Sequence, residues 1–168
     1  LNYPGSATPG RGFYAATDVR GRTVLVVNLM GQIHMGDPLD NPFAAAAALL
    51  ERWRPGREAA AIFVDFHAEA TSEKMAMAHF LDGRVSAVVG THTHVPTADA
   101  QILPGGTGFQ SDAGMCGDYD SVIGVRKDIP LYRFTRGMKG ARFEPAAGEA
   151  TVCGTLIVTD DRTGLAQA

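Results

Sequence analysis

Three of the five histidines, His67, His92 and His94, stand within a few residues of the ends of apolar runs of the sequence. His67 follows the run Ala59–Val64, and the other two follow the run Val85–Val89. Both runs are typical of buried strands. Imidazole is the commonest metal ligand in proteins, and clustered histidines and acids are its usual setting. These two segments are therefore the chain's best evidence of chemistry.

The segment between the two runs determines how the two predicted strands lie relative to each other. Thr71–Leu81 is rich in Ala, Met, Glu and Lys, which predicts a helix with Thr71 or Ser72 as its N-cap. A crossover of this length makes the flanking strands parallel neighbours whose carboxyl ends lie side by side. That edge of an open α/β sheet is where ligands bind, so we expect His67 to meet the His92/His94 pair there.

The spacing of His92 and His94 strengthens this interpretation. Side chains at i and i+2 of an extended segment share a face, so both imidazoles are expected to reach a common centre. A histidine near a strand end, taken alone, is more often a hydrogen-bonded loop residue than a ligand. The H-x-H pair beside His67 favours a metal site over that alternative.

Length, composition and net charge limit the classes of protein to which this chain can belong. The 168 residues predict one domain, 1–168, and the 45% hydrophobic and 20% charged contents are globular values. A net charge of −3 without a Lys/Arg cluster argues against a nucleic-acid partner. No apolar run approaches the length of a membrane span, and no signal peptide is visible. Two cysteines, Cys116 and Cys153, are too few for a disulfide framework, so we expect a reducing compartment, the cytoplasm.

The remaining segments predict an α/β fold. Arg22–Leu29 is expected to share a sheet with the strands Ala59–Asp65 and Val85–Val89 and to form a hairpin with Phe13–Val19. Asn41 as N-cap and Pro42 at N1 begin a helix that runs to about Arg54. Further predicted elements are a loop over Gly31–Pro42 with Asp37-Pro38 as a breaker, strands over Ala100–Leu103, Ala141–Pro145 and Ala150–Thr159, a helix over Asp128–Arg136, and a tail over Asp160–Ala168.

The histidine segments carry a resemblance to a known family. Asp65–Lys74, Val88–Val95 and Ser111–Met115 resemble the YmdB-like family of bacterial calcineurin-type metallophosphoesterases. The similarity extends along nearly the whole chain, including Asn2–Pro4, Thr97–Asp99 and Tyr119-Asp120. It implies part of a two-sheet sandwich flanked by helices, with this chain as the carboxyl-terminal portion of the domain and the amino-terminal strands missing.

The same resemblance implies a two-metal phosphodiesterase acting on 2′,3′- and 3′,5′-cyclic nucleotides. His67 and His92 look like ligands of one ion and His94 of the other. The remaining ligands and the proton-donating histidine would lie in the missing amino-terminal segment, so the resemblance assigns no catalytic residue to this chain. Mixed His, Asn and carboxylate ligation suits two divalent ions, Fe or Mn first and Zn as a further choice.

Several consequences and alternatives follow. We expect the 168-residue chain alone to bind metal weakly, to catalyse poorly or not at all, and to form homo-oligomers through an exposed apolar edge.

One alternative function is that of a different metal hydrolase, since H-x-H also opens the amidohydrolase motif, although no histidine follows His94. The other is a metal-binding or regulatory module without catalytic activity.

Other polar residues are candidates for supporting roles. Asp65 and Glu69 flank His67 and could orient it, while Glu69 could equally favour the dipole of the following helix. Asp112 could be recruited to the site. We interpret His34 and His79 as structural or exposed. Cys116 is expected to be a small structural thiol, and it stands where the family resemblance suggests threonine or a similar residue.

Overall fold

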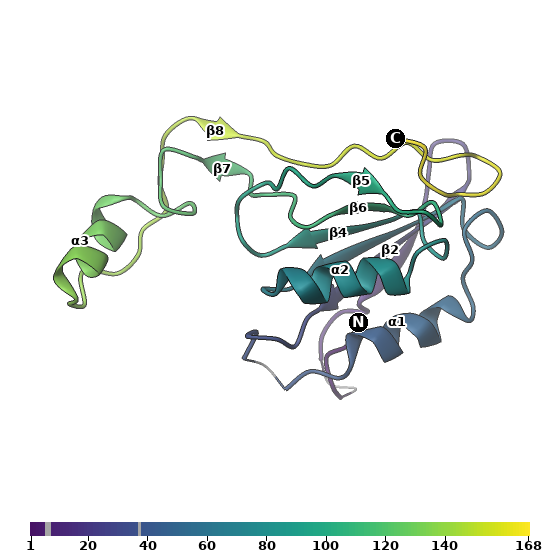
Figure 1. Ribbon diagram of the computed structural model, residues 1–168, viewed down its shortest axis with the longest axis horizontal. Coiled ribbons are helices and arrows are strands. Elements are labelled where there is room, and N and C mark those ends of the chain that lie inside the picture. The colour runs from purple at the N-terminus through teal and green to yellow at the C-terminus, as the bar shows by residue number, and fades with distance from the viewer. Residues whose placement is uncertain (6–7, 37) are drawn as a thin grey trace.

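A six-stranded sheet forms the centre of the computed structural model, which describes residues 1–5, 8–36 and 38–168. The strand order is β1-β2-β3-β4-β6-β5 (Figure 1). Strands β2, β3, β4 and β6 are parallel, and the edge strands β1 and β5 are antiparallel to their neighbours. The strands are β1 (Phe13–Thr17), β2 (Thr23–Met30), β3 (Ala61–His67), β4 (Ala87–Thr91), β5 (Gln101–Ile102) and β6 (Gly108–Gln110).

This arrangement confirms the predicted α/β fold and its strand–helix–strand unit. The two strands that precede the histidines, β3 and β4, are parallel neighbours, and β2 pairs with β3 on the other side. The hairpin of β1 and β2 is also present, although β1 ends at Thr17 because Asp18 turns the chain by accepting hydrogen bonds from Arg20 N and Arg22 N.

Helices α1 (Pro42–Leu50) and α2 (Thr71–Phe80) lie together on one side of the sheet (Figure 1). They cover the side chains that alternate toward that side along β2 and β3, a period of two that fits a half-covered strand. The hydrophobic core between them contains Leu25, Val27, Leu29, Ala46, Leu50, Ile62, Val64, Phe66, Met77, Ala78, Leu81, Val85 and Val88. The core therefore packs against one face of β3 and β4. The carboxyl ends of these two strands carry the histidine segments.

Helix α1 begins as predicted. The Asn41 side chain accepts hydrogen bonds from Phe43 N at 2.9 Å and Ala44 N at 3.2 Å, and Pro42 occupies the first turn. The helix ends at Leu50 rather than near Arg54. Arg54 instead bonds Glu58 through both its main chain and its guanidinium, which closes a turn after the helix.

Replacing Asn41 with Ala is expected to lower the free energy of unfolding by about 1 kcal/mol, because two main-chain donors lose their acceptor. Thermal or urea unfolding measures the change. Asn41→Ser keeps an acceptor oxygen and is expected to unfold close to the parent. Equal losses in both variants would show that the cap contributes nothing.

Helix α2 begins one residue earlier than predicted. Ala70 is the N-cap, without a side-chain hydrogen bond, and Thr71 is the first helical residue. The prediction of a Thr71 or Ser72 cap is therefore wrong. The first turn is fixed by tertiary contacts instead, since Glu73 accepts hydrogen bonds from Gln32 N and Ile33 N in the loop after β2.

A separate lobe extends from the sheet beyond the carboxyl ends of its strands (Figure 1). It contains β7 (Gly117–Asp118) paired with β8 (Ala150–Thr151), and helix α3 (Asp128–Arg136), which confirms the predicted helix. The predicted strand Ala141–Pro145 is wrong: only Pro145 makes an isolated bridge, to Val125. The predicted strand Ala150–Thr159 shrinks to β8, because the partner strand β7 is only two residues long.

The carboxyl-terminal segment lies across the sheet from α1 and α2 (Figure 1). It is not a free tail, because Ala166 N bonds Gly106 O and the Gly164 carbonyl accepts from Ser86 Oγ. The predicted strand Ala100–Leu103 shortens to β5, and β6 is an additional strand that the sequence did not predict. The predicted loop Gly31–Pro42 is present up to the start of α1, with Asp37 outside the described residues.

None of the helices in the described part of the chain has the length and apolar character needed to cross a membrane.

Candidate metal centre

The carboxyl ends of three parallel strands meet in one row. Met30 at the end of β2 pairs with His67 at the end of β3, which pairs with Thr91 at the end of β4. Main-chain bonds continue past the strand ends, from Gly31 N to His67 O and from Ala68 N to Thr91 O. These pairings hold the main chain of His67 in place, from β2 on one side and from β4 on the other.

The His67 imidazole is oriented by a chain of hydrogen bonds. Its Nδ1 lies 2.9 Å from Thr91 Oγ1, and the Thr91 hydroxyl donates to Asp65 Oδ1 at 2.9 Å. Because that hydroxyl has one proton, it accepts from His67, so Nδ1 carries hydrogen and Nε2 presents its lone pair. Asp65 is held in turn by the Asn28 side-chain amide.

The electrostatic surroundings of His67 favour the neutral ring. Burial first, and the neighbouring His92 second, lower the pKa of His67 below its ordinary value. Asp65 acts in the opposite direction and is outweighed. A neutral imidazole with a directed Nε2 lone pair is the form that binds a metal ion.

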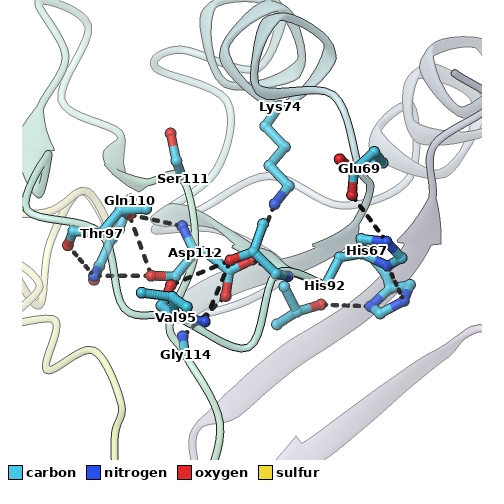
Figure 2. Close-up of polar contacts among 12 residues, drawn as sticks. His67, Glu69, Lys74, His92, Val95, Thr97, Gln110, Ser111, Asp112 and Gly114 are labelled. Carbon is cyan, nitrogen blue, oxygen red and sulfur yellow. Dashed lines mark hydrogen bonds and ion pairs between the residues drawn. The ribbon is translucent and has the colours of Figure 1, made fainter. Parts of the chain in front are cut away.

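His92 lies directly against His67 (Figure 2). His92 Nδ1 is 3.1 Å from His67 Nε2, and the ring centroids are 4.9 Å apart at an interplanar angle of 76°. On its outer side, His92 Nε2 lies 3.0 Å from Glu69 Oε2. The structure thus brings two of the three predicted ligands together, from the ends of adjacent strands.

His94 is oriented differently from the other two histidines. Strand β4 ends at Thr91, and His92 and His94 have φ angles of 143° and 66°, so this segment is not extended. The expectation that both side chains share one face is therefore wrong, since the i, i+2 rule holds only for extended backbone. His94 Nδ1 donates to the Ile123 carbonyl at 2.8 Å, which leaves Nε2 as the nitrogen with a lone pair.

The backbone around the two histidines is strained. Positive φ is uncommon outside glycine and costs about 1–3 kcal/mol for each residue. His92, His94 and the Ile123 residue that His94 contacts all adopt it. Strain of this kind persists only where surrounding contacts hold the chain in place, and it gathers at functional sites.

The spacing of His67 Nε2 and His92 Nδ1 fits a shared ion. Metal–imidazole bonds of about 2.0–2.1 Å at octahedral or tetrahedral angles place neighbouring nitrogens about 2.8–3.4 Å apart. The observed 3.1 Å falls in that interval. Across residues 1–5, 8–36 and 38–168, however, no three His, Cys, Asp or Glu side chains form a group that could hold an ion. The described residues thus supply two nitrogens at a spacing suited to one ion, without a third His, Cys, Asp or Glu ligand beside them.

The three acidic candidates contact the histidine segments in different ways. Asp65 reaches His67 only through Thr91, and Glu69 pairs with His92 rather than with His67. Asp112 is fully buried and bonds the main chain of the H-x-H segment.

The other candidates lie at the surface. His34 is exposed in the loop after β2, and His79 is exposed in the last turn of α2. Cys116 is a free, exposed thiol whose Sγ contacts the Cys153 carbonyl at 3.6 Å.

Two residues in the surroundings of the histidines were missed from the sequence. Thr91 follows Gly90 at the end of an apolar run, and its place beside a histidine was the available signal. Lys74 is 1% exposed, whereas a lysine in a helix is almost always at the surface unless it is paired. No local pattern distinguished it.

Comparisons with known proteins show which family the chain is similar to. A family model described as YmdB-like protein matches residues 1–168. A 2′,3′-cyclic-nucleotide 2′-phosphodiesterase of Bacillus subtilis is 44% identical over 162 residues, which is 96% of this chain and 59% of the relative.

Two solved structures have the same fold. A hypothetical protein from Thermus thermophilus matches with a TM-score of 0.79 at 52% identity, over 89% of this chain and 56% of that protein. A novel phosphatase from Mycoplasma pneumoniae matches with a TM-score of 0.77 at 34% identity, over 89% of this chain and 53% of that protein. The chain therefore spans between half and three fifths of the length of these relatives.

Proposed function

The chain belongs to the YmdB-like protein family, and from that membership we propose that it supplies part of the active site of a metal-dependent phosphodiesterase that hydrolyses cyclic nucleotides. The 2′,3′-cyclic nucleotides are the first substrate class, after the activity named for the Bacillus subtilis relative. The 3′,5′-cyclic nucleotides are a second class to be tested.

One observation carries this proposal: the 3.1 Å approach of His67 Nε2 to His92 Nδ1 at adjoining strand ends. Each ring has a protein acceptor at its other nitrogen, Thr91 for His67 and Glu69 for His92. Carboxylates and hydroxyls in that position fix ring orientation in metal sites. His94, anchored on Ile123, presents Nε2 for a second ion.

Two bound divalent ions would polarise the phosphoryl oxygens and activate water for an in-line displacement. His67 and His92 would hold one ion and His94 the other. The remaining donors would come from outside the described residues, because these alone form no group of three. A mixture of imidazole, amide and carboxylate donors suits Fe or Mn, with Zn as a further choice.

Apolar surface on one face of the sheet supports the proposal that this chain is part of a larger domain. On the face away from the helices, Val26 is 40% exposed and Phe63 only partly covered, so apolar surface remains there. We propose that this chain is the carboxyl-terminal portion of a two-sheet sandwich whose other strands pack on that face. A second copy of the chain is the other candidate for covering it.

Replacing Thr91 with Val is expected to weaken metal binding by about 10–100-fold, because the isosteric change removes the acceptor that fixes His67 Nδ1–H. Calorimetric titration with Zn²⁺ measures the affinity. Thr155→Val is a matched control, since Thr155 donates to Gln110 Oε1 instead of to a site residue. Unchanged affinity in a folded Thr91→Val protein would exclude this orienting role.

The proposed function is tested by the hydrolysis of 2′,3′-cyclic AMP with Mn²⁺, Fe²⁺ or Zn²⁺, alongside the 3′,5′ isomer. We expect metal-dependent hydrolysis by a protein of the length of the relatives, and slow or absent hydrolysis by residues 1–168 alone. Equal rates from both would place the whole catalytic apparatus in this chain. No hydrolysis by the longer protein with any of these metals would contradict the proposal.

A further inference from the structure

A fully buried ion pair lies beneath the H-x-H segment. Lys74 Nζ of α2 is 3.0 Å from Asp112 Oδ2 in the loop after β6, and each side chain is 1% exposed. Figure 2 shows Lys74 extending from the helix to Asp112. The desolvation free energy of two buried charges can equal or exceed the free energy gained from their attraction, so such a pair is weak evidence for stability. Its contacts indicate a different role.

The Asp112 carboxylate holds the middle of the histidine segment. Its Oδ2 accepts from Thr93 N at 2.8 Å as well as from Lys74, and its Oδ1 accepts from Gly114 N at 2.9 Å. Thr93 stands between His92 and His94, both of which have a positive φ. The strained segment is therefore fixed at its centre by one buried carboxylate.

Asp112 is itself rigidly placed. Its main-chain N donates to Thr97 Oγ1 at 2.9 Å, and its main-chain O accepts from Thr97 N at 3.0 Å. The next residue, Ala113, donates to Gly90 O in β4. Movement of the carboxylate is thus resisted from β4, through Ala113, and from the loop at Thr97, which lies beside Asp112 in Figure 2.

The charge state of Asp112 matches this role. Burial alone would raise its pKa, but hydrogen bonds from Thr93 N and Gly114 N, together with Lys74, lower the pKa below its ordinary value. The group is therefore an ionised acceptor at neutral pH, and charge-assisted hydrogen bonds to main-chain N–H groups are stronger than neutral ones.

We propose that Lys74 and Asp112 are positioning residues for the candidate metal site, because their ion pair holds Thr93 N–H and thereby directs the His92 imidazole at His67. Lys74 fixes the carboxylate, and the carboxylate fixes the segment. Only the expected effect on metal binding rests on the proposed function. The orientation of His92 is a property of the protein by itself.

The test compares Asp112→Asn and the neutral double variant Lys74→Met/Asp112→Asn with the parent. Glu73→Gln is a matched control, since Glu73 is 7% exposed in the same turn of α2 and also holds a loop main chain, at Gln32 and Ile33. NMR measures the contact between the ring protons of His67 and His92 without metal. Zn²⁺ titration then measures affinity, and thermal unfolding verifies the fold.

We expect the ring contact to be lost in both Asp112 variants, with Zn²⁺ affinity about 10–100-fold lower. Glu73→Gln should unfold at a lower temperature and keep the ring contact and the affinity. A folded Asp112→Asn or double variant with the parent's ring contact would overturn the inference. If the parent shows the ring contact but binds no Zn²⁺, the proposed function fails, while the positioning role is still decided by NMR.

Discussion

In a protein of the length of the relatives, replacing His92 with Ala is expected, under the proposed function, to lower kcat/KM for 2′,3′-cyclic AMP by about 10²–10⁴-fold, because metal ions contribute several kcal/mol of charge stabilisation and each 1.36 kcal/mol is a factor of ten. His92 supplies Nδ1 next to His67 Nε2, and its loss leaves one imidazole at that point. Its side chain is 34% exposed, so its removal takes little from the core. Activity should fall without a matching loss of stability.

Steady-state rates, bound metal and the melting temperature are measured together for this variant. His79→Ala is the matched control, since His79 is exposed at the far end of α2 and lies outside the site. Its rates should equal those of the parent. A folded His92→Ala protein with parental metal content and near-parental turnover would remove His92 from the site.

Replacing Gly90 with Ala is expected to lower the free energy of unfolding by about 3 kcal/mol, which is about 6–12 °C in Tm for a chain of this size. A Cβ at Gly90 would collide with the Ser111 carbonyl oxygen and lie 2.8 Å from Lys74 Cδ. Neither neighbour has room to move. Ser111 is held through its N–H and hydroxyl by Asp99, and Lys74 is paired with Asp112.

Gly154→Ala is the control for the Gly90 substitution, because a Cβ there meets open space. A surface change of that kind is expected to stay within about 0.5 kcal/mol. Equal melting temperatures for the two alanine variants would show that β4 and the Ser111 loop separate easily. In that case Gly90 would not be needed for the close contact under the site.

The sequence predicted the part of the fold that local patterns determine. Apolar runs of strand length flanking a helical segment specify parallel neighbours, and the crossover then brings His67 and His92 together. Asn41 and Pro42 likewise predicted the start of α1, because a cap is decided by residues adjacent in the sequence.

The parts that failed depend on contacts between distant residues. The predicted strands Ala141–Pro145 and Ala150–Thr159 have strand-like composition, but β7 offers a partner of only two residues. The H-x-H segment was expected to be extended. Asp112, nineteen positions after Thr93, holds it in a different conformation.

The buried Lys74 was unpredictable for the same reason. A lysine at a helical position predicts an exposed side chain, and its burial becomes favourable only once Asp112 is placed beneath it by the loop after β6. Local pattern therefore located the histidines, whereas their orientation depends on tertiary hydrogen bonds.

The most direct measurement is an anomalous-scattering map from crystals of the protein grown with Zn²⁺. We expect one ion about 2.0–2.1 Å from both His67 Nε2 and His92 Nδ1, and a second at the same distance from His94 Nε2. The opposite result is a map in which His67 and His92 remain hydrogen-bonded to each other and the zinc binds elsewhere. That result would contradict the assignment of these histidines as metal ligands.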